Sequence, residues 1–260
     1  MKTALITGAS SGIGRKLCEE FARHDHNLVL VARRKELLEE IKKELEDKYG
    51  IDVYCFPYDL NNDVKAVYDY CRIKNITIDV LINNAGYGDF GIFIDSDIKK
   101  ALGMIDLNDK ALVALTYHFI QDMKERGTGH IINVGSVASF VPGPYMAVYY
   151  ATKSFVMSFS LALREELKKD NIKVSLLCPA PTRSPFWQVA NGETTAAYDN
   201  VFARMPEDAA RTCYRMYERN QSYAIDGLAY KISIFFMRHF PLTISAGLIG
   251  FVQRKTKKKN

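Results

Sequence analysis

Short apolar runs alternate with longer amphipathic segments along most of the chain. The runs are nearly continuous in apolar residues and occupy residues 3–7, 27–32, 52–56, 79–83, 130–134 and 173–177. Such runs are typical of parallel strands that are covered on both faces. The segments between them have helical spacing and occupy about residues 12–24, 34–49, 62–74, 97–126 and 147–170. Within one of them, Leu38, Ile41 and Leu45 fall on one face before Gly50 ends the helix.

This alternation predicts an α/β fold. We expect a Rossmann-like, doubly wound parallel sheet in a single domain, with helices on both faces and right-handed crossovers. A further helix is predicted from Pro206, and a last strand at residues 222–226. The predicted catalytic domain covers residues 1–240, with a lid at about 185–220. Residues 241–260 form an extension that is first apolar and then basic.

The composition changes this picture little. The chain has 260 residues, of which 48% are hydrophobic and 25% charged, as in ordinary globular proteins. The net charge of +5 equals the five basic residues within 254–260, so the rest is neutral and no nucleic-acid partner is expected. Five scattered cysteines without a CxxC pair, and an N-terminus unlike a signal peptide, predict reduced thiols in the cytoplasm. The five histidines lack ligand spacing, so no metal site is expected.

The sequence TGASSGIG at residues 7–14 follows the first strand and opens the first helix. Its glycines, Gly8, Gly12 and Gly14, allow the backbone to approach a pyrophosphate, which the N-terminus of the helix attracts. The spacing GxxxGxG differs from the more common GxGxxG, so the position of the turn after the first strand is the stronger signal.

The end of the second strand predicts which dinucleotide binds. An acidic residue at this place accepts hydrogen bonds from a ribose 2′-hydroxyl, but here the chain has Arg33 and Arg34. A guanidinium suits a 2′-phosphate, so the pair favours NADP(H) over NAD(H). The alternative is a solvent-exposed arginine pair at the start of a helix.

Two tyrosines lie side by side in VYYATKSF, residues 148–155. Tyr149 is four residues before Lys153 and Tyr150 three before it, so both are neighbours of the lysine on a helix and the spacing does not choose between them. A nearby ammonium favours the phenolate, so we expect it to lower the pKa of the phenol from about 10. Such a pair is suited to proton transfer.

Taken together, TGASSGIG, NNAG at residues 83–86, Asn108, Ser136 and YYATK resemble the short-chain dehydrogenase/reductase family over about residues 3–185. The resemblance implies NAD(P)-dependent interconversion of an alcohol and a carbonyl compound, commonly by homodimers or homotetramers. The family pattern YxxxK selects Tyr149 as the proton donor and acceptor, with Tyr150 as a packing residue. It also places Ser136 thirteen residues before Tyr149.

The resemblance also assigns the other roles. Ser136 holds the substrate oxygen, Lys153 holds the nicotinamide ribose, and Asn108 supports a proton relay through water; the alternative for Asn108 is a loop or helix-kink asparagine. The expected cofactor-binding residues are Gly8, Ser10, Ser11, Gly12, Ile13, Gly14, Arg33, Arg34, Asp59, Leu60, Asn84, Ala85, Gly86, Tyr149, Lys153, Pro179, Thr182 and Ser184. Asp59 has a helix N-cap as its alternative. CPAPTRSP at residues 178–185 departs from the family pattern, because Ala180 replaces a glycine and Ser184 stands where a threonine is common.

The substrate is expected to be a lipophilic ketone or alcohol, such as a steroid or a 3-oxoacyl compound. The reason is a predicted apolar lid wall formed by Phe186, Trp187, Tyr198, Phe202 and Met205. The apolar stretch 241–252 is too short to span a bilayer and begins at Pro241. Three roles stay open for it: a lid helix, an oligomer contact, or a weak anchor at a membrane surface. The rival function is a catalytically idle NADP(H)-binding sensor.

Overall fold

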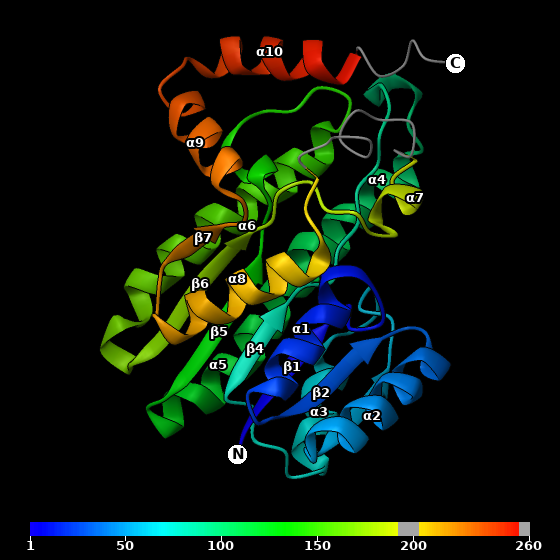
Figure 1. Cartoon of the computed structure of the whole chain (residues 1–260), viewed down its shortest axis with the longest axis vertical. Helices are drawn as coiled ribbons and strands as arrows, with labels where there is room; N and C mark the ends of the chain where they lie inside the picture. Colours follow the sequence, from blue (N-terminus) through cyan, green and yellow to red (C-terminus); the bar gives the residue numbers. More distant parts are fainter. Residues whose placement is uncertain (192–202, 255–260) are drawn as a thin grey trace.

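The computed structural model describes residues 1–191 and 203–254. Its centre is a seven-stranded, all-parallel sheet with the strand order β3-β2-β1-β4-β5-β6-β7 (Figure 1). The strands are β1 (Lys2–Thr7), β2 (His26–Ala32), β3 (Val53–Pro57), β4 (Val80–Asn83), β5 (Gly129–Val134), β6 (Ile172–Cys178) and β7 (Tyr223–Ile225). Every strand expected from the apolar runs is present, and so is the last strand at residues 222–226. The predicted doubly wound α/β fold is confirmed.

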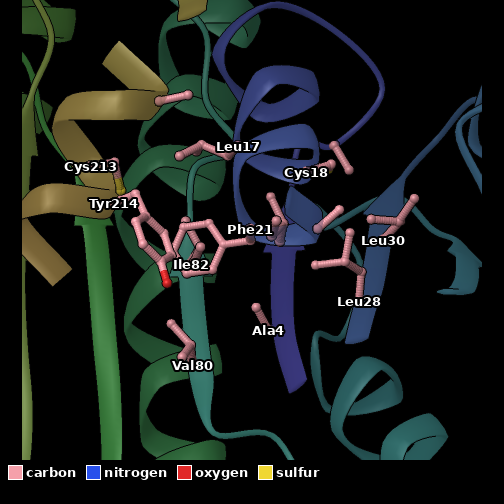
Figure 2. Close-up of a cluster of buried hydrophobic side chains, with 14 of the residues drawn as sticks. Ala4, Leu17, Cys18, Phe21, Leu28, Leu30, Val80, Ile82, Cys213 and Tyr214 are labelled. Carbon is pink, nitrogen blue, oxygen red and sulfur yellow. The ribbon is translucent and has the colours of Figure 1, made fainter. Parts of the chain in front are cut away.

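Helices cover both faces of the sheet. Their bounds are α1 (Gly12–Arg23), α2 (Lys35–Tyr49), α3 (Lys65–Ile73), α4 (Ile98–Ile105), α5 (Leu112–Arg126), α6 (Ala147–Glu166), α7 (Phe186–Val189), α8 (Pro206–Glu218), α9 (Leu228–Met237) and α10 (Leu242–Arg254). The apolar faces of α1, α2 and α8 build the core on one side, and those of α3 and α5 build it on the other. Figure 2 shows Phe21 of α1 beside Tyr214 of α8, with their ring centroids 5.2 Å apart.

Two predicted segments differ from expectation. The single helix expected over 97–126 is divided, because the π-helical segment Asp106–Ala111 lies between α4 and α5. The segment expected as a lid over 185–220 is divided as well, since α8 packs into the core through Ala209, Ala210 and Cys213. Tyr198 and Phe202 of the expected apolar wall lie outside the described residues.

The strand order reverses direction between β1 and β4. In open α/β sheets such a reversal leaves a crevice beyond the carboxyl ends of the two strands, where ligands bind. The helices α9 and α10 lie at this end of the molecule, the end toward which the strand arrows point in Figure 1. No helix in the described ranges is long and apolar enough to cross a membrane.

Candidate active site

The turn after β1 is shaped for close approach to an anion. Gly8 and Gly12 have φ values of +66° and +55°, a region that favours glycine. A Cβ on Gly14 would lie 2.2 Å from the carbonyl oxygen of Gly8, so only hydrogen fits there. Because α1 begins at Gly12, the turn presents the free N–H groups of a helix N-terminus to the crevice.

A side-chain network joins this turn to the end of β4. The Thr7 hydroxyl accepts hydrogen bonds from the backbone N–H groups of Asn84 and Ala85, at 2.9 and 3.0 Å. The side-chain amide of Asn84 in turn donates to the carbonyl oxygen of Thr7 at 2.8 Å. The ends of the two central strands are therefore held together, and the NNAG segment is fixed beside the glycine turn.

Two arginines stand at the rim next to the turn. Arg34 donates to the Ser10 hydroxyl at 2.9 Å, and Arg33 lies 4.0 Å from the Asp59 carboxylate. The side chain of Arg33 is 76% exposed, so its guanidinium is available to a ligand in the crevice. Asp59 also accepts from the backbone of Asn61, which is a turn contact and not an N-cap of α3.

The residues expected to carry the chemistry meet on the other side of the crevice. Ser136 lies two residues after β5 and caps the short 3-10 helix Val137–Phe140, where its hydroxyl oxygen accepts from the Ala138 N–H at 3.1 Å. Tyr149 and Lys153 occupy the first two turns of α6, and the lysine Nζ lies 5.8 Å from the tyrosine ring centroid. The buried Lys153 ammonium donates to the carbonyl oxygen of Val134 at 2.9 Å.

Burial decides the protonation of this cluster. It raises the pKa of Tyr149 to about 12, while a hydrogen bond with Ser136 lowers it. It lowers the pKa of Lys153 to about 8. The expected lowering of the pKa of Tyr149 is therefore wrong for this structure, because desolvation of the phenolate raises the pKa more than the hydrogen bond with Ser136 lowers it. Near neutral pH the phenol keeps its proton and is a donor.

Asn108 lies behind the cavity wall and is fully buried in the π-helical segment. Its amide oxygen accepts from the Tyr87 N–H at 3.1 Å, and its amide nitrogen donates to the Tyr87 carbonyl at 3.0 Å and to Thr152 at 3.1 Å. A Cβ on Gly86 would lie 2.8 Å from the amide oxygen of Asn108. The π-bulge therefore places the Asn108 amide directly against Gly86, and no residue larger than glycine fits at position 86.

Asp109 is a residue of this site that the sequence did not indicate. Burial raises its pKa to about 7, while the charge of Lys153 lowers it, and one carboxylate oxygen is buried with no partner within the described residues. The only sequence signal was its place directly after Asn108. Asp109 is therefore a second titratable group whose charge acts on Lys153.

One cavity of about 700 Å³ joins these parts. It is lined by every expected cofactor-binding residue and by Ser136, and Asn108 alone of the expected site lies outside the lining. Thr182 and Ser184 come from the loop after β6, which passes over the glycine turn; Ser184 Cβ would lie 3.4 Å from a Cβ on Gly12. The crevice therefore brings together all the segments that the sequence singled out.

The far end of the cavity is apolar and was only partly expected. Phe186 and Trp187 line it, whereas Met205 is exposed and does not. Residues that the sequence did not indicate complete the wall: Tyr87, Phe90, Met146, Ile234, Met237 and Ile249. Tyr150, which was expected only to pack, also lines the cavity, and its hydroxyl accepts a hydrogen bond from Gln253 of α10 at 3.0 Å.

Comparison with known proteins agrees with this geometry. The model of the family described as short chain dehydrogenase matches residues 2–194. A very-long-chain 3-oxoacyl-CoA reductase of Laccaria bicolor is 35% identical over 178 residues, which are 67% of this chain but only 53% of that protein. An NADP-dependent 3-hydroxy acid dehydrogenase of Schizosaccharomyces pombe is 35% identical over 236 residues, covering 86% of this chain and 90% of that protein.

A solved structure gives the same result for the fold. The short-chain dehydrogenase of Sphingobium yanoikuyae in complex with NADPH superimposes with a TM-score of 0.83 at 34% identity, covering 91% of this chain and 92% of that one. The similarity therefore extends beyond the glycine turn to nearly the whole chain.

Proposed function

Since this chain belongs to the short-chain dehydrogenase family, we propose that it is an NADP(H)-dependent oxidoreductase that interconverts a ketone and a secondary alcohol on a lipophilic, uncharged substrate. Its relatives and structural neighbours include NADP-dependent dehydrogenases and an NADPH complex. The observation that carries the proposal is the position of Tyr149. It faces one continuous cavity between the dinucleotide crevice and an apolar wall.

The residues present fit NADP(H). The turn packs tightly because Gly14 has no Cβ, and it leaves the N-terminus of α1 facing the crevice, where a pyrophosphate would bind. The exposed Arg33 and the Arg34–Ser10 pair suit a 2′-phosphate. Lys153 would hold the nicotinamide ribose. When bound, NADPH supplies the hydride.

The chain's own residues supply the proton. Tyr149 keeps its proton at neutral pH because burial raises the pKa to about 12, so it donates that proton to the ketone oxygen as the oxygen becomes an alcohol. Ser136 donates a hydrogen bond to the same oxygen and stabilises its developing negative charge. Lys153, whose pKa burial lowers to about 8, is ready to return a proton to the phenolate. Asn108 fixes the backbone of Tyr87 through its two side-chain hydrogen bonds.

The substrate end of the cavity favours a neutral molecule. Among its described lining residues, the cations Arg33, Arg34 and Lys153 all lie in the predicted dinucleotide half, and the opposite wall is aromatic and aliphatic. A free carboxylate would find no countercharge there and would lose its hydration. Long-chain 3-oxoacyl esters or thioesters and hydroxysteroid-like ketones are therefore favoured over short free acids.

The test is NADPH oxidation with a panel of ketones. We expect turnover of 3-oxoacyl esters or steroid ketones and a specificity constant at least tenfold lower for the matching free 3-oxo acids. Tyr149→Phe should lower kcat by about 10²–10⁴-fold and leave the Kd for NADPH within about twofold, since the hydroxyl supplies only proton transfer. Tyr150→Phe is the matched control and should keep most of kcat.

Two results would contradict the proposal. Full turnover by Tyr149→Phe would remove the phenol as the proton donor. NADPH binding without oxidation on any ketone class would favour the idle sensor instead. We further propose that the protein is a cytoplasmic homo-oligomer. The five unpaired thiols support the location, and the homo-oligomers common in the family support the assembly.

A further inference from the structure

The two last helices expose apolar side chains that a surface helix normally keeps inside. On α9, Leu228, Ile232, Phe235 and Phe236 recur at helical spacing, and between 50% and 74% of each residue is exposed. On α10, Ile244 and Leu248 lie one turn apart and are each 49% exposed. We refer to these six residues as the C-terminal apolar face.

The opposite sides of both helices are already occupied. Ser233, Ile234 and Met237 of α9 and Ile249 and Gln253 of α10 line the cavity. The inward side of each helix is therefore part of the cavity wall, and the C-terminal apolar face is a second apolar side. The outer side of a surface helix is normally polar, but these two helices carry apolar residues on the outer side as well and lie at the outer end of the molecule (Figure 1).

The charge of this segment is one-sided. From Gly227 to the end of the chain there are seven lysines and arginines and no aspartate or glutamate. Lys231 and Arg238 are exposed among the apolar residues of α9 and directly after it, and the remaining five lie within residues 254–260. A partner that covers the C-terminal apolar face must therefore accept both apolar and positively charged groups.

We propose that the C-terminal apolar face binds the surface of a membrane that contains anionic lipids, with α9 and α10 lying in the interface. Exposed Phe, Leu and Ile beside Lys and Arg match the acyl chains and headgroups of such a surface. The helices have 10 and 13 residues and a turn at Pro241 between them, so each is too short to span. The cytoplasmic leaflet is the anionic one, in agreement with the proposed location.

A second copy of this chain fits the face less well. A two-fold interface brings the same patch of both subunits together. That arrangement would bring Lys231 and Arg238 of both copies into one interface, with no acidic residue in the segment to compensate. An anionic bilayer supplies the missing negative charge, so electrostatic complementarity favours the membrane.

Vesicle flotation of the full-length protein tests the proposal. We expect binding to vesicles of phosphatidylcholine with phosphatidylglycerol, weaker binding to phosphatidylcholine alone, and loss of the difference at high salt. The variant Phe236→Asp/Leu248→Asp should lower the partition coefficient by at least about tenfold, since each buried large apolar side chain contributes about that much. Ile73→Asp/Ile94→Asp, at exposed apolar residues outside this face, is the control and should bind as wild type.

A second variant separates charge from apolar contact. Lys231→Glu/Arg238→Glu should weaken binding to anionic vesicles by about fivefold for each basic residue lost and leave binding to phosphatidylcholine alone nearly unchanged; it decides the question if the aspartate pair fails to fold. Wild-type protein that stays unbound to both vesicles would overturn the proposal. So would a homodimer, measured by light scattering, that the aspartate pair dissociates. Turnover of a water-soluble ketone in the same samples keeps this result separate from the catalytic proposal.

Discussion

Asp109→Asn should stabilise the folded protein relative to wild type, and this difference should grow as the pH rises. Burial raises the pKa of this carboxyl from 3.8 to about 7. A carboxyl with a raised pKa in the folded state favours folding below pH 4 and loses that contribution as the pH rises through 7, because the folded protein must then ionise a group that the unfolded chain ionises easily. The asparagine variant has no such loss.

The size of the effect follows from the shift. About three pKa units correspond to about 4 kcal/mol as an upper bound. Because Asp109 is only half-buried, water screens part of this energy, and we expect about 2 kcal/mol. The stability difference between variant and wild type should therefore rise by about 2 kcal/mol between pH 4 and pH 8.5.

Urea unfolding of both proteins across this range measures the effect. Asp47→Asn, at an exposed carboxylate of α2, is the control and should show no comparable rise. A constant difference for Asp109→Asn would refute the reasoning, since it would mean that the carboxyl ionises with equal ease in the folded and unfolded chains. The variant should also narrow the pH range of activity, because it removes a charge that raises the pKa of Lys153.

Three other substitutions test the site. Arg33→Asp should lower the preference for NADPH over NADH by about tenfold to a hundredfold, as expected for loss of a charge-assisted contact; an unchanged ratio of the two Kd values would exclude Arg33 as the 2′-phosphate ligand. Gly14→Ala should cost about 1–3 kcal/mol in thermal unfolding, because the new methyl group meets the Gly8 carbonyl, and wild-type stability would contradict that contact. Ser136→Ala should lower kcat by about 10²-fold with little change in NADPH affinity, whereas an equal loss in both would indicate a structural role.

The sequence predicted the frame of the site well because local patterns determine it. The apolar runs place the strands, and the motifs at their carboxyl ends are brought to one crevice by the parallel order of the sheet. The π-helical segment at Asn108 was not predictable, because it depends on hydrogen bonds with the backbone of Tyr87, 21 residues away. The role of α10 depends on a still longer contact, between Tyr150 and Gln253, which no local pattern reveals.

The raised pKa of Tyr149 was missed for a related reason. Sequence spacing showed that a lysine is near, but it did not show how deeply the phenol is buried. In the folded protein, desolvation of the phenolate raises the pKa more than the hydrogen bond with Ser136 lowers it.

Tyr149 and Tyr150 are consecutive residues of α6, but they contact different parts of the cavity wall. Tyr149 is the proposed proton donor, and Tyr150 holds the helix α10 at the far wall through Gln253. The position of the proposed proton donor is thus set by the start of α6, while the shape of the far wall is set by a C-terminal segment that contacts the same turn. Mutation of that segment can alter substrate range without moving the proton donor, so selection can tune the two separately.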